Sequence, residues 1–137
     1  MSRLGFLERR EEYPRVTKRL ELGRYNGQLK GNYIEVWLNW SREFNDRMVE
    51  YRDRLGKIAQ MPSGTDEEWK AADGALDELA PSMFALNAEF WGCEEDEVRA
   101  IYEIDAELWR WIAGQANKMR EDYREKRKKA GSATTGS

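Results

Sequence analysis

The chain has 137 residues, of which 40% are hydrophobic and 36% are charged, and its formal net charge is -3 at pH 7. This length fits one domain with a buried core and is too short for two. A net charge this close to zero gives no global argument for a polyanionic partner such as nucleic acid. The charges are nevertheless zoned, because residues 1–30 and 118–129 are basic whereas residues 94–107 are acidic.

The cysteine content and the N-terminal sequence predict a compartment. Cys93 is the only cysteine, so no intrachain disulfide can form and a disulfide-rich secreted scaffold is excluded. The first residues lack an apolar stretch of signal-peptide length, and no apolar run is long enough to cross a bilayer. We therefore expect a cytosolic protein without membrane contact, in which the sequon at Asn39 is not glycosylated.

Residues 1–15 are expected to form an N-terminal arm, and the segment from Val16 to Asn39 predicts a β-hairpin. In its first half, Val16, Leu20 and Leu22 share one face of the stretch VTKRLEL. In its second half, GNYIEVWLN alternates with the two-residue period of a strand. The loop between them, GRYNGQLKG, contains an Asn-Gly pair and three glycines, which favour a turn.

A helix is predicted directly after the hairpin. Ser41 offers an N-cap hydroxyl for a helix from about Arg42 to Gln60. Apolar residues follow at spacings of three and four, and they predict one buried stripe: Phe44, Met48, Tyr51, Leu55 and Ile58.

A second helix is predicted to begin after Thr65, which forms a capping box with Glu68. Pro81 should bend or restart this helix because proline lacks an amide hydrogen, and Gly92 should end it. The apolar face of its first half contains Trp69, Ala72, Leu76 and Leu79.

The segment 97–104 is ambiguous, since VRAIYEI alternates like a strand but also continues a helical stripe. Asp105 interrupts that stripe and is expected to cap a final helix ending near Lys126. Residues 127–137 are expected to form a basic, flexible C-terminal tail. The predicted fold class is therefore α+β and mainly α, with an N-terminal β-hairpin packed against three to four helices in a single domain, residues 16–126.

Residue types that support catalysis or metal binding are scarce. The sequence contains no histidine, the commonest general base and transition-metal ligand. Cys93 has no imidazole to activate it, so we expect an unreactive thiol. The acidic stretch CEEDEVRAIYE lacks the glycine and the ligand spacing of a calcium loop, and no glycine-rich phosphate loop precedes a helix. We therefore expect no enzyme, cofactor, metal or small-molecule substrate.

The sequence contains six tryptophans, more than a small helical core needs. Trp37, Trp69 and Trp91 are predicted to lie in the core. Trp109 and Trp111 are two residues apart and cannot share a helical face, so we expect Trp109 in the core and Trp111 at a partner surface. The candidate protein-binding residues are the aromatic and arginine side chains typical of interface hot spots: Trp111, Trp40, Tyr123 and Arg110.

The last predicted helix also allows a second interpretation. Arginines and aromatic residues interleave in WRWIAGQANKMREDYREKRKK, which is compatible with a DNA-binding or packaging accessory protein. The same helix follows a strongly acidic segment. We therefore expect protein binding ahead of nucleic-acid binding.

Three stretches occur in a characteristic order: GNYIEVWLN before the first helix, LAPSMFALNAEFWGCEEDE at the end of the second, and AELWRWIAGQANKMREDY in the last. Over residues 20–123 this pattern resembles the short tail assembly chaperones of long-tailed bacteriophages. One departure is FWGCEEDE, which stands where such proteins often carry a Trp-Asn pair and an Asp-Glu-Gly turn.

The resemblance implies a non-enzymatic chaperone. Its partners are the tape measure protein, whose hydrophobic helices it binds and keeps soluble, and the tail tube protein, whose subunits it helps to recruit. On this interpretation the chain acts in the cytoplasm of a bacterial host and can form homo-oligomers. The hairpin is the rigid platform, and the helices supply a groove for the client.

Overall fold

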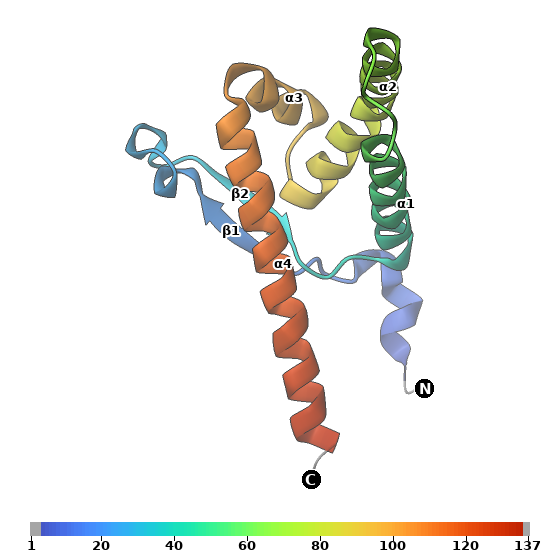
Figure 1. The fold of residues 1–137 in the computed structure, drawn as a ribbon. Coiled ribbons are helices and arrows are strands. Elements are labelled where there is room, and N and C mark those ends of the chain that lie inside the picture. The colour runs from blue at the N-terminus through green and yellow to red at the C-terminus, as the bar shows by residue number, and fades with distance from the viewer. Residues whose placement is uncertain (1–3, 136–137) are drawn as a thin grey trace.

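The computed structural model describes residues 4–135, except for the side chains of Phe6, Glu11, Glu12 and residues 131–135. These residues form, in chain order, the 3-10 helix η1 (Gly5–Glu12), β1 (Thr17–Glu21), the 3-10 helices η2 (Leu22–Arg24) and η3 (Gly27–Leu29), β2 (Tyr33–Trp37), α1 (Arg42–Ala59), α2 (Asp66–Trp91), α3 (Glu95–Ile104) and α4 (Ala106–Thr135). The predicted fold class, α+β and mainly α with an N-terminal hairpin, is confirmed (Figure 1).

The hairpin is antiparallel, with Leu20 of β1 opposite Ile34 of β2. Leu20, Ile34 and Val36 are buried, as the alternation in the sequence predicted. Two strands cannot bury this face by themselves, so helices must cover it. Both α4 and the second half of α2 contact β2, while α3 packs against α2 and α4 (Figure 1).

The side chain of Asn39 fastens the N-terminal arm to the end of the hairpin. Its Oδ1 accepts hydrogen bonds from the backbone amide of Val16 at 2.7 Å and from Nε1 of Trp37 at 2.9 Å. Its Nδ2 donates to the carbonyl oxygen of Pro14 at 3.2 Å. This single amide group therefore fixes the chain just before β1 against the chain just after β2.

Three helices begin at the residues predicted from the sequence, and a side chain caps each of them. Ser41 Oγ accepts from the amide of Phe44 at 3.2 Å, and Thr65 Oγ1 accepts from the amide of Glu68 at 3.1 Å. Asp105 Oδ1 accepts from the amide of Leu108 at 3.1 Å, which confirms Asp105 as the cap of α4.

The ambiguous segment 97–104 is helical and belongs to α3. Its start is supported by a hydrogen bond from the backbone amide of Glu94 to Glu97 Oε1, at 2.9 Å. Three acids in the first turn, Glu95, Asp96 and Glu97, also favour a helix because they oppose the positive end of the helix dipole. The capping chemistry therefore decides against a strand.

Of the two outcomes predicted for the helix containing Pro81, a bend or a restart, the bend is observed: α2 is continuous from Asp66 to Trp91, and Figure 1 shows its second half turning away from α1 toward the hairpin. One predicted boundary needs correction. The last helix does not end near Lys126 but continues to Thr135. Residues 126–130 are all good helix formers, and a helix that is already nucleated extends through such residues at little cost. The predicted tail is thus helical up to Thr135.

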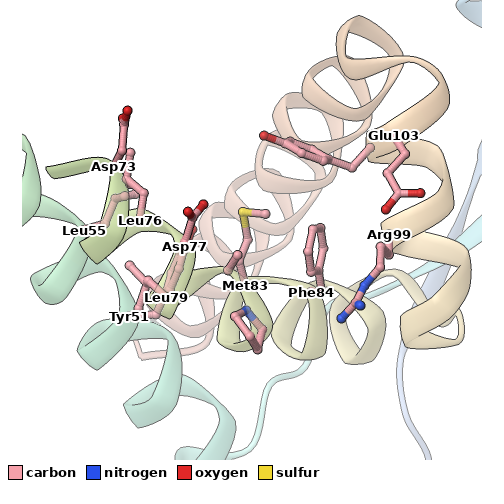
Figure 2. A pocket seen from close by; sticks show the side chains of 13 residues that line it. Tyr51, Leu55, Asp73, Leu76, Asp77, Leu79, Met83, Phe84, Arg99 and Glu103 are labelled. Carbon is pink, nitrogen blue, oxygen red and sulfur yellow. The ribbon is translucent and has the colours of Figure 1, made fainter. Parts of the chain in front are cut away.

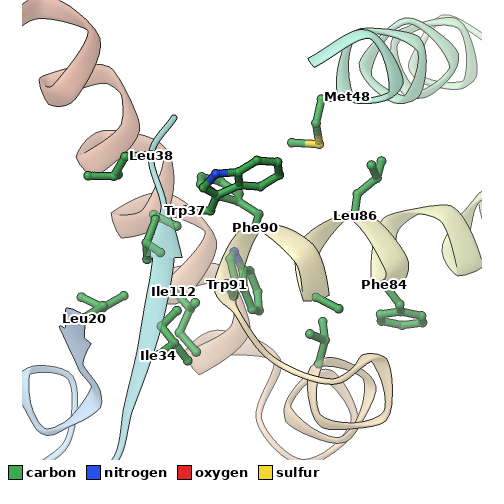
Figure 3. Close-up of a cluster of buried hydrophobic side chains, with 14 of the residues drawn as sticks. Leu20, Ile34, Trp37, Leu38, Met48, Phe84, Leu86, Phe90, Trp91 and Ile112 are labelled. Atoms are coloured by element: carbon green, nitrogen blue, oxygen red, sulfur yellow. The ribbon is translucent and has the colours of Figure 1, made fainter. Parts of the chain in front are cut away.

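The end of α2 docks directly on β2. Trp91 is completely buried in a core built from the hairpin, α2, α3 and α4 (Figure 3). Gly92 follows with φ of 65°, a left-handed conformation that ends the helix as predicted. A Cβ atom at this position would lie only 2.7 Å from the carbonyl oxygen of Glu35. Only glycine allows the helix end to approach the strand this closely.

We predict that Ser41→Ala and Thr65→Ala will each lower the free energy of unfolding by about 1 kcal/mol, because each removes the acceptor for an otherwise unpaired helix amide. Urea unfolding followed by circular dichroism measures this loss. Ser63→Ala is the matched control, since Ser63 is exposed between the two helices. An unchanged midpoint for both cap variants would contradict the assigned helix starts.

Gly92→Ala is expected to destabilise the fold by about 2 kcal/mol or more, because it adds a backbone clash to the cost of a left-handed alanine. Gly31→Ala separates the two effects. Gly31 also has a positive φ, 91°, but a Cβ there meets no atom within 4 Å, so only the conformational cost of about 1 kcal/mol remains. If Gly92→Ala and Gly31→Ala lower the free energy of unfolding equally, in thermal or urea unfolding, the close approach to Glu35 makes no difference to stability.

Candidate functional site

A groove lies between α1, α2 and α3 and has a volume of about 640 Å³. Figure 2 shows the side chains that line it, and they come from all three helices. The apolar and aromatic lining residues are Tyr51, Leu55, Leu76, Leu79, Ala80, Pro81, Met83, Phe84 and Tyr102. Nine of the 13 lining residues are thus apolar or aromatic, a lining that suits another amphipathic helix.

The groove exists because the apolar stripe of α1 is only partly covered. Phe44 and Met48, near the hairpin, are 1% and 6% exposed. Leu55, two turns further along the same stripe, is 37% exposed, and Leu76 on the facing part of α2 is 43% exposed. The sequence predicted one buried stripe, but only its first half has a core to enter. The second half is left as an apolar surface.

The charged residues of the groove are mostly acidic. Asp73 and Asp77 on α2 and Glu103 on α3 line it, together with Arg99. Arg99 is the single cation of this set, and it forms an ion pair with Glu95 at 3.7 Å. An apolar floor with acidic margins favours a helix that carries basic residues beside its apolar stripe.

Tyr51 contributes a half-buried phenol to the groove. Burial raises the pKa of this side chain above its usual value. The hydroxyl therefore stays protonated at neutral pH and is available as a hydrogen-bond donor.

Trp69 is not a core residue, which corrects the sequence-based prediction. It is 56% exposed, because it lies in the first turns of α2, beyond the part of the helix that packs on the hairpin. Asp73 and Leu76, which line the groove, lie four and seven residues further on and hence on the same face of α2. Trp69 therefore extends the groove surface at one end. Trp37 and Trp91 are buried as predicted.

Two of the predicted binding residues lie early in α4, away from this groove. Trp111 is half-buried and its ring centroid is 5.4 Å from that of Tyr25, in the hairpin connection. Its neighbour Arg110 is exposed. Trp109 is also half-buried, 5.7 Å from Trp91. Both tryptophans pack against the core, so the expected contrast between an inner Trp109 and an outer Trp111 is small.

Trp40 and Tyr123 lie in a different region. Trp40 packs on Phe44 and Phe90 and donates from Nε1 to the carbonyl oxygen of Trp37 at 3.0 Å. Tyr123 is half-buried against the core. Trp111 and Tyr123 are separated by about 18 Å along α4, at 1.5 Å per residue. The four predicted residues therefore do not form one site.

Cys93 is the one nucleophile of interest, and its environment suppresses its reactivity. The side chain is partly buried, and its thiol donates to the carbonyl oxygen of Trp91 at 3.5 Å. Burial raises the pKa of Cys93 to about 11, with further contributions from the negative charges of Glu97 and Glu94. Within residues 4–135, no three metal-ligating side chains are grouped closely enough to hold an ion.

None of the helices in the described part of the chain combines the length and apolar content required to cross a bilayer. In comparisons with known proteins, no protein-family model, no curated protein and no solved structure matches this chain.

The pKa of Cys93 leads to a prediction about thiol labelling. With a pKa of about 11 rather than 9.0, the folded protein contains about a hundredfold less thiolate at about pH 8 than an ordinary thiol. Colorimetric disulfide-exchange labelling should be correspondingly slow in the native protein and fast in concentrated guanidinium chloride. Equal rates in the two conditions would show that the Cys93 thiol of the folded protein is accessible and has an ordinary pKa.

Proposed function

We propose that this chain is a non-enzymatic assembly chaperone that binds an amphipathic helix of a client protein in the groove between α1, α2 and α3. One observation carries the proposal. The apolar stripes of α1 and α2 leave the core and continue uncovered on the surface, where they line a concave groove. A surface of this kind buries apolar area only when a partner occupies it.

The size and chemistry of the groove favour a helix as the occupant. Leu55, Leu76 and Trp69 offer apolar contacts on two neighbouring helices, which suits side chains at positions i, i+3 and i+4 of a third helix. Asp73, Asp77 and Glu103 lie beside these contacts and attract lysine or arginine on the margins of the client helix. An extended segment would not meet the first condition, and an acidic segment would not meet the second.

The resemblance to tail assembly chaperones points to one specific client protein. The tape measure protein of a long phage tail would offer many apolar helical segments, and copies of a small chaperone along it would keep those segments from aggregating in the bacterial cytoplasm. Recruitment of tail tube subunits would then use another surface of the bound chaperone. This part of the proposal is supported by the sequence pattern, and the groove supports helix binding in general.

DNA binding through the basic C-terminal part of α4 is the second candidate. Figure 1 shows this part extending away from the other elements, where a duplex could reach it. However, Arg124 and Lys128 are paired with Glu121 and Glu125 at 3.3 and 3.8 Å, which reduces the positive field along the helix. A polyanion site needs many unpaired cations, so we rank this candidate second.

Trp69→Ala is expected to weaken client binding by about 2 kcal/mol, or roughly thirtyfold in Kd, if Trp69 is a hot spot at the end of the groove. It should leave the melting temperature nearly unchanged, because the side chain is more than half exposed. Binding is measured by fluorescence anisotropy with a labelled, basic amphipathic helical peptide, and by co-purification with a tape measure fragment.

Val49→Ala is the matched control for this experiment. Val49 lies on α1, is also 56% exposed, and does not line the groove, so its variant should bind both clients like the wild type. If Trp69→Ala and Val49→Ala behave alike, the groove is not the binding site. If the wild type ignores both clients but binds duplex DNA with a steep salt dependence, the basic helix carries the function instead.

A further inference from the structure

A second hollow, distinct from the groove, lies where the N-terminal arm, the end of the hairpin and α4 meet. It has a volume of about 410 Å³. Three arginines from two distant parts of the chain line it: Arg10 and Arg15 of the arm, and Arg127 of α4. Tyr13, Trp37 and Trp40 form its aromatic walls. No carboxylate is among its described lining residues, which is unusual in a chain with more acidic than basic residues.

The three guanidinium groups have no counter-charge in the described structure. None of the ion pairs between described residues includes Arg10, Arg15 or Arg127. All three side chains are exposed, so water screens their mutual repulsion, and an anion that joins them forms charge-assisted hydrogen bonds without breaking an existing ion pair. We therefore propose that this hollow is a binding site for an oxyanion, supplied by an acidic segment of a protein partner.

Arginines that stack on aromatic rings can still use their N–H groups to bind an anion. The guanidinium carbon of Arg15 lies 4.0 Å from the ring centroid of Trp37, and that of Arg127 lies 5.5 Å from the ring centroid of Tyr123. A cation–π contact uses the face of the guanidinium, whereas its N–H donors lie in the plane and at the edges. Each stacked arginine is thus held in place while its donors remain able to bind a carboxylate or phosphate in bidentate fashion.

The backbone around Arg15 is fixed before any ligand arrives. Asn39 lines the hollow and, through its bonds to Val16 and Pro14, fixes the backbone on both sides of Arg15. Arg120, one turn before Arg124 in α4, lies 4.6 Å from the ring centroid of Trp40, behind the aromatic wall. Burial and the nearby positive charge of Arg124 lower the pKa of Arg120, and the negative charge of Glu121 opposes this shift. Arg120 thus adds its own positive charge behind the aromatic wall.

The aromatic walls favour an acidic peptide over single-stranded nucleic acid. Binding of single strands relies on bare aromatic faces on which bases stack. Two of the three aromatic side chains are covered here, since Arg15 lies over Trp37 and Arg120 lies over Trp40, whereas Tyr13 is 57% exposed. The hollow also has room for one or two side chains rather than a long backbone path. Glutamate or aspartate side chains of a partner fit these limits.

The test begins with inorganic phosphate as the simplest oxyanion and a short glutamate-rich peptide as the proposed ligand type. In a titration of the wild-type protein at low salt, both should shift the NMR signals of the Trp37 and Trp40 indole N–H groups. Arg15→Gln and Arg127→Gln should each weaken binding of the peptide about tenfold, as expected for loss of a hydrogen bond to a charged group. Thermal unfolding confirms that each variant is folded.

Arg52→Gln is the matched control, because Arg52 is an exposed arginine of α1 that lines neither the hollow nor the groove; its variant should bind like the wild type. If Arg15→Gln fails to fold because it loses its contact with Trp37, Arg10→Gln replaces it. The proposal is overturned if neither phosphate nor the peptide shifts the indole signals, or if Arg52→Gln weakens binding as much as the hollow variants. An oligothymidine of matched charge that binds more tightly than the peptide would overturn the choice of ligand.

Discussion

The contact between the end of α2 and β2 is the constraint on which the rest of the fold depends. Gly92 lets the backbone of the helix end lie against the carbonyl oxygen of Glu35, at a distance that no other residue allows. Trp91 then fills the space between the hairpin and the helices as one of the completely buried side chains of the core. A two-stranded hairpin is only marginally stable by itself, so the contact with α2 stabilises it.

The same constraint explains why the groove forms. With its C-terminal end tied to β2, α2 must leave α1 part of the way along (Figure 1). The helix contains Pro81, which donates no amide hydrogen to the preceding turn and therefore favours a bend. The first half of α2 stays beside the end of α1, too far from the hairpin to share its core. Leu55, Leu76 and Trp69 are exposed for this reason.

The parts of the fold that depend on neighbours in sequence could be predicted, and those that depend on distant contacts could not. Ser41, Thr65 and Asp105 each accept a hydrogen bond from the amide three residues further on, so these helix caps can be predicted from the sequence. The burial of Trp69 depends on whether another element covers it, and helical periodicity says only which face it shares.

The hollow lined by Arg10, Arg15 and Arg127 could not be predicted either, because its lining comes from residues 10–15, 37–41 and 127, which are far apart in the chain. The sequence showed only that both ends of the chain are basic.

The basic zones at the two ends of the chain meet in the folded protein, at the hollow lined by Arg10, Arg15 and Arg127. Asp73, Asp77 and Glu103 lie at the groove, and of these only Glu103 belongs to the acidic zone, residues 94–107. The helix α1 links the two, since Ser41 before its first turn lines the hollow and Leu55 near its end lines the groove, about 20 Å apart along the helix. A partner with a basic amphipathic helix and an acidic segment could engage both surfaces at once, and the second contact would then be intramolecular. Opposite charges at two fixed points also set the direction in which such a partner lies along α1, because the reversed orientation would place like charges together.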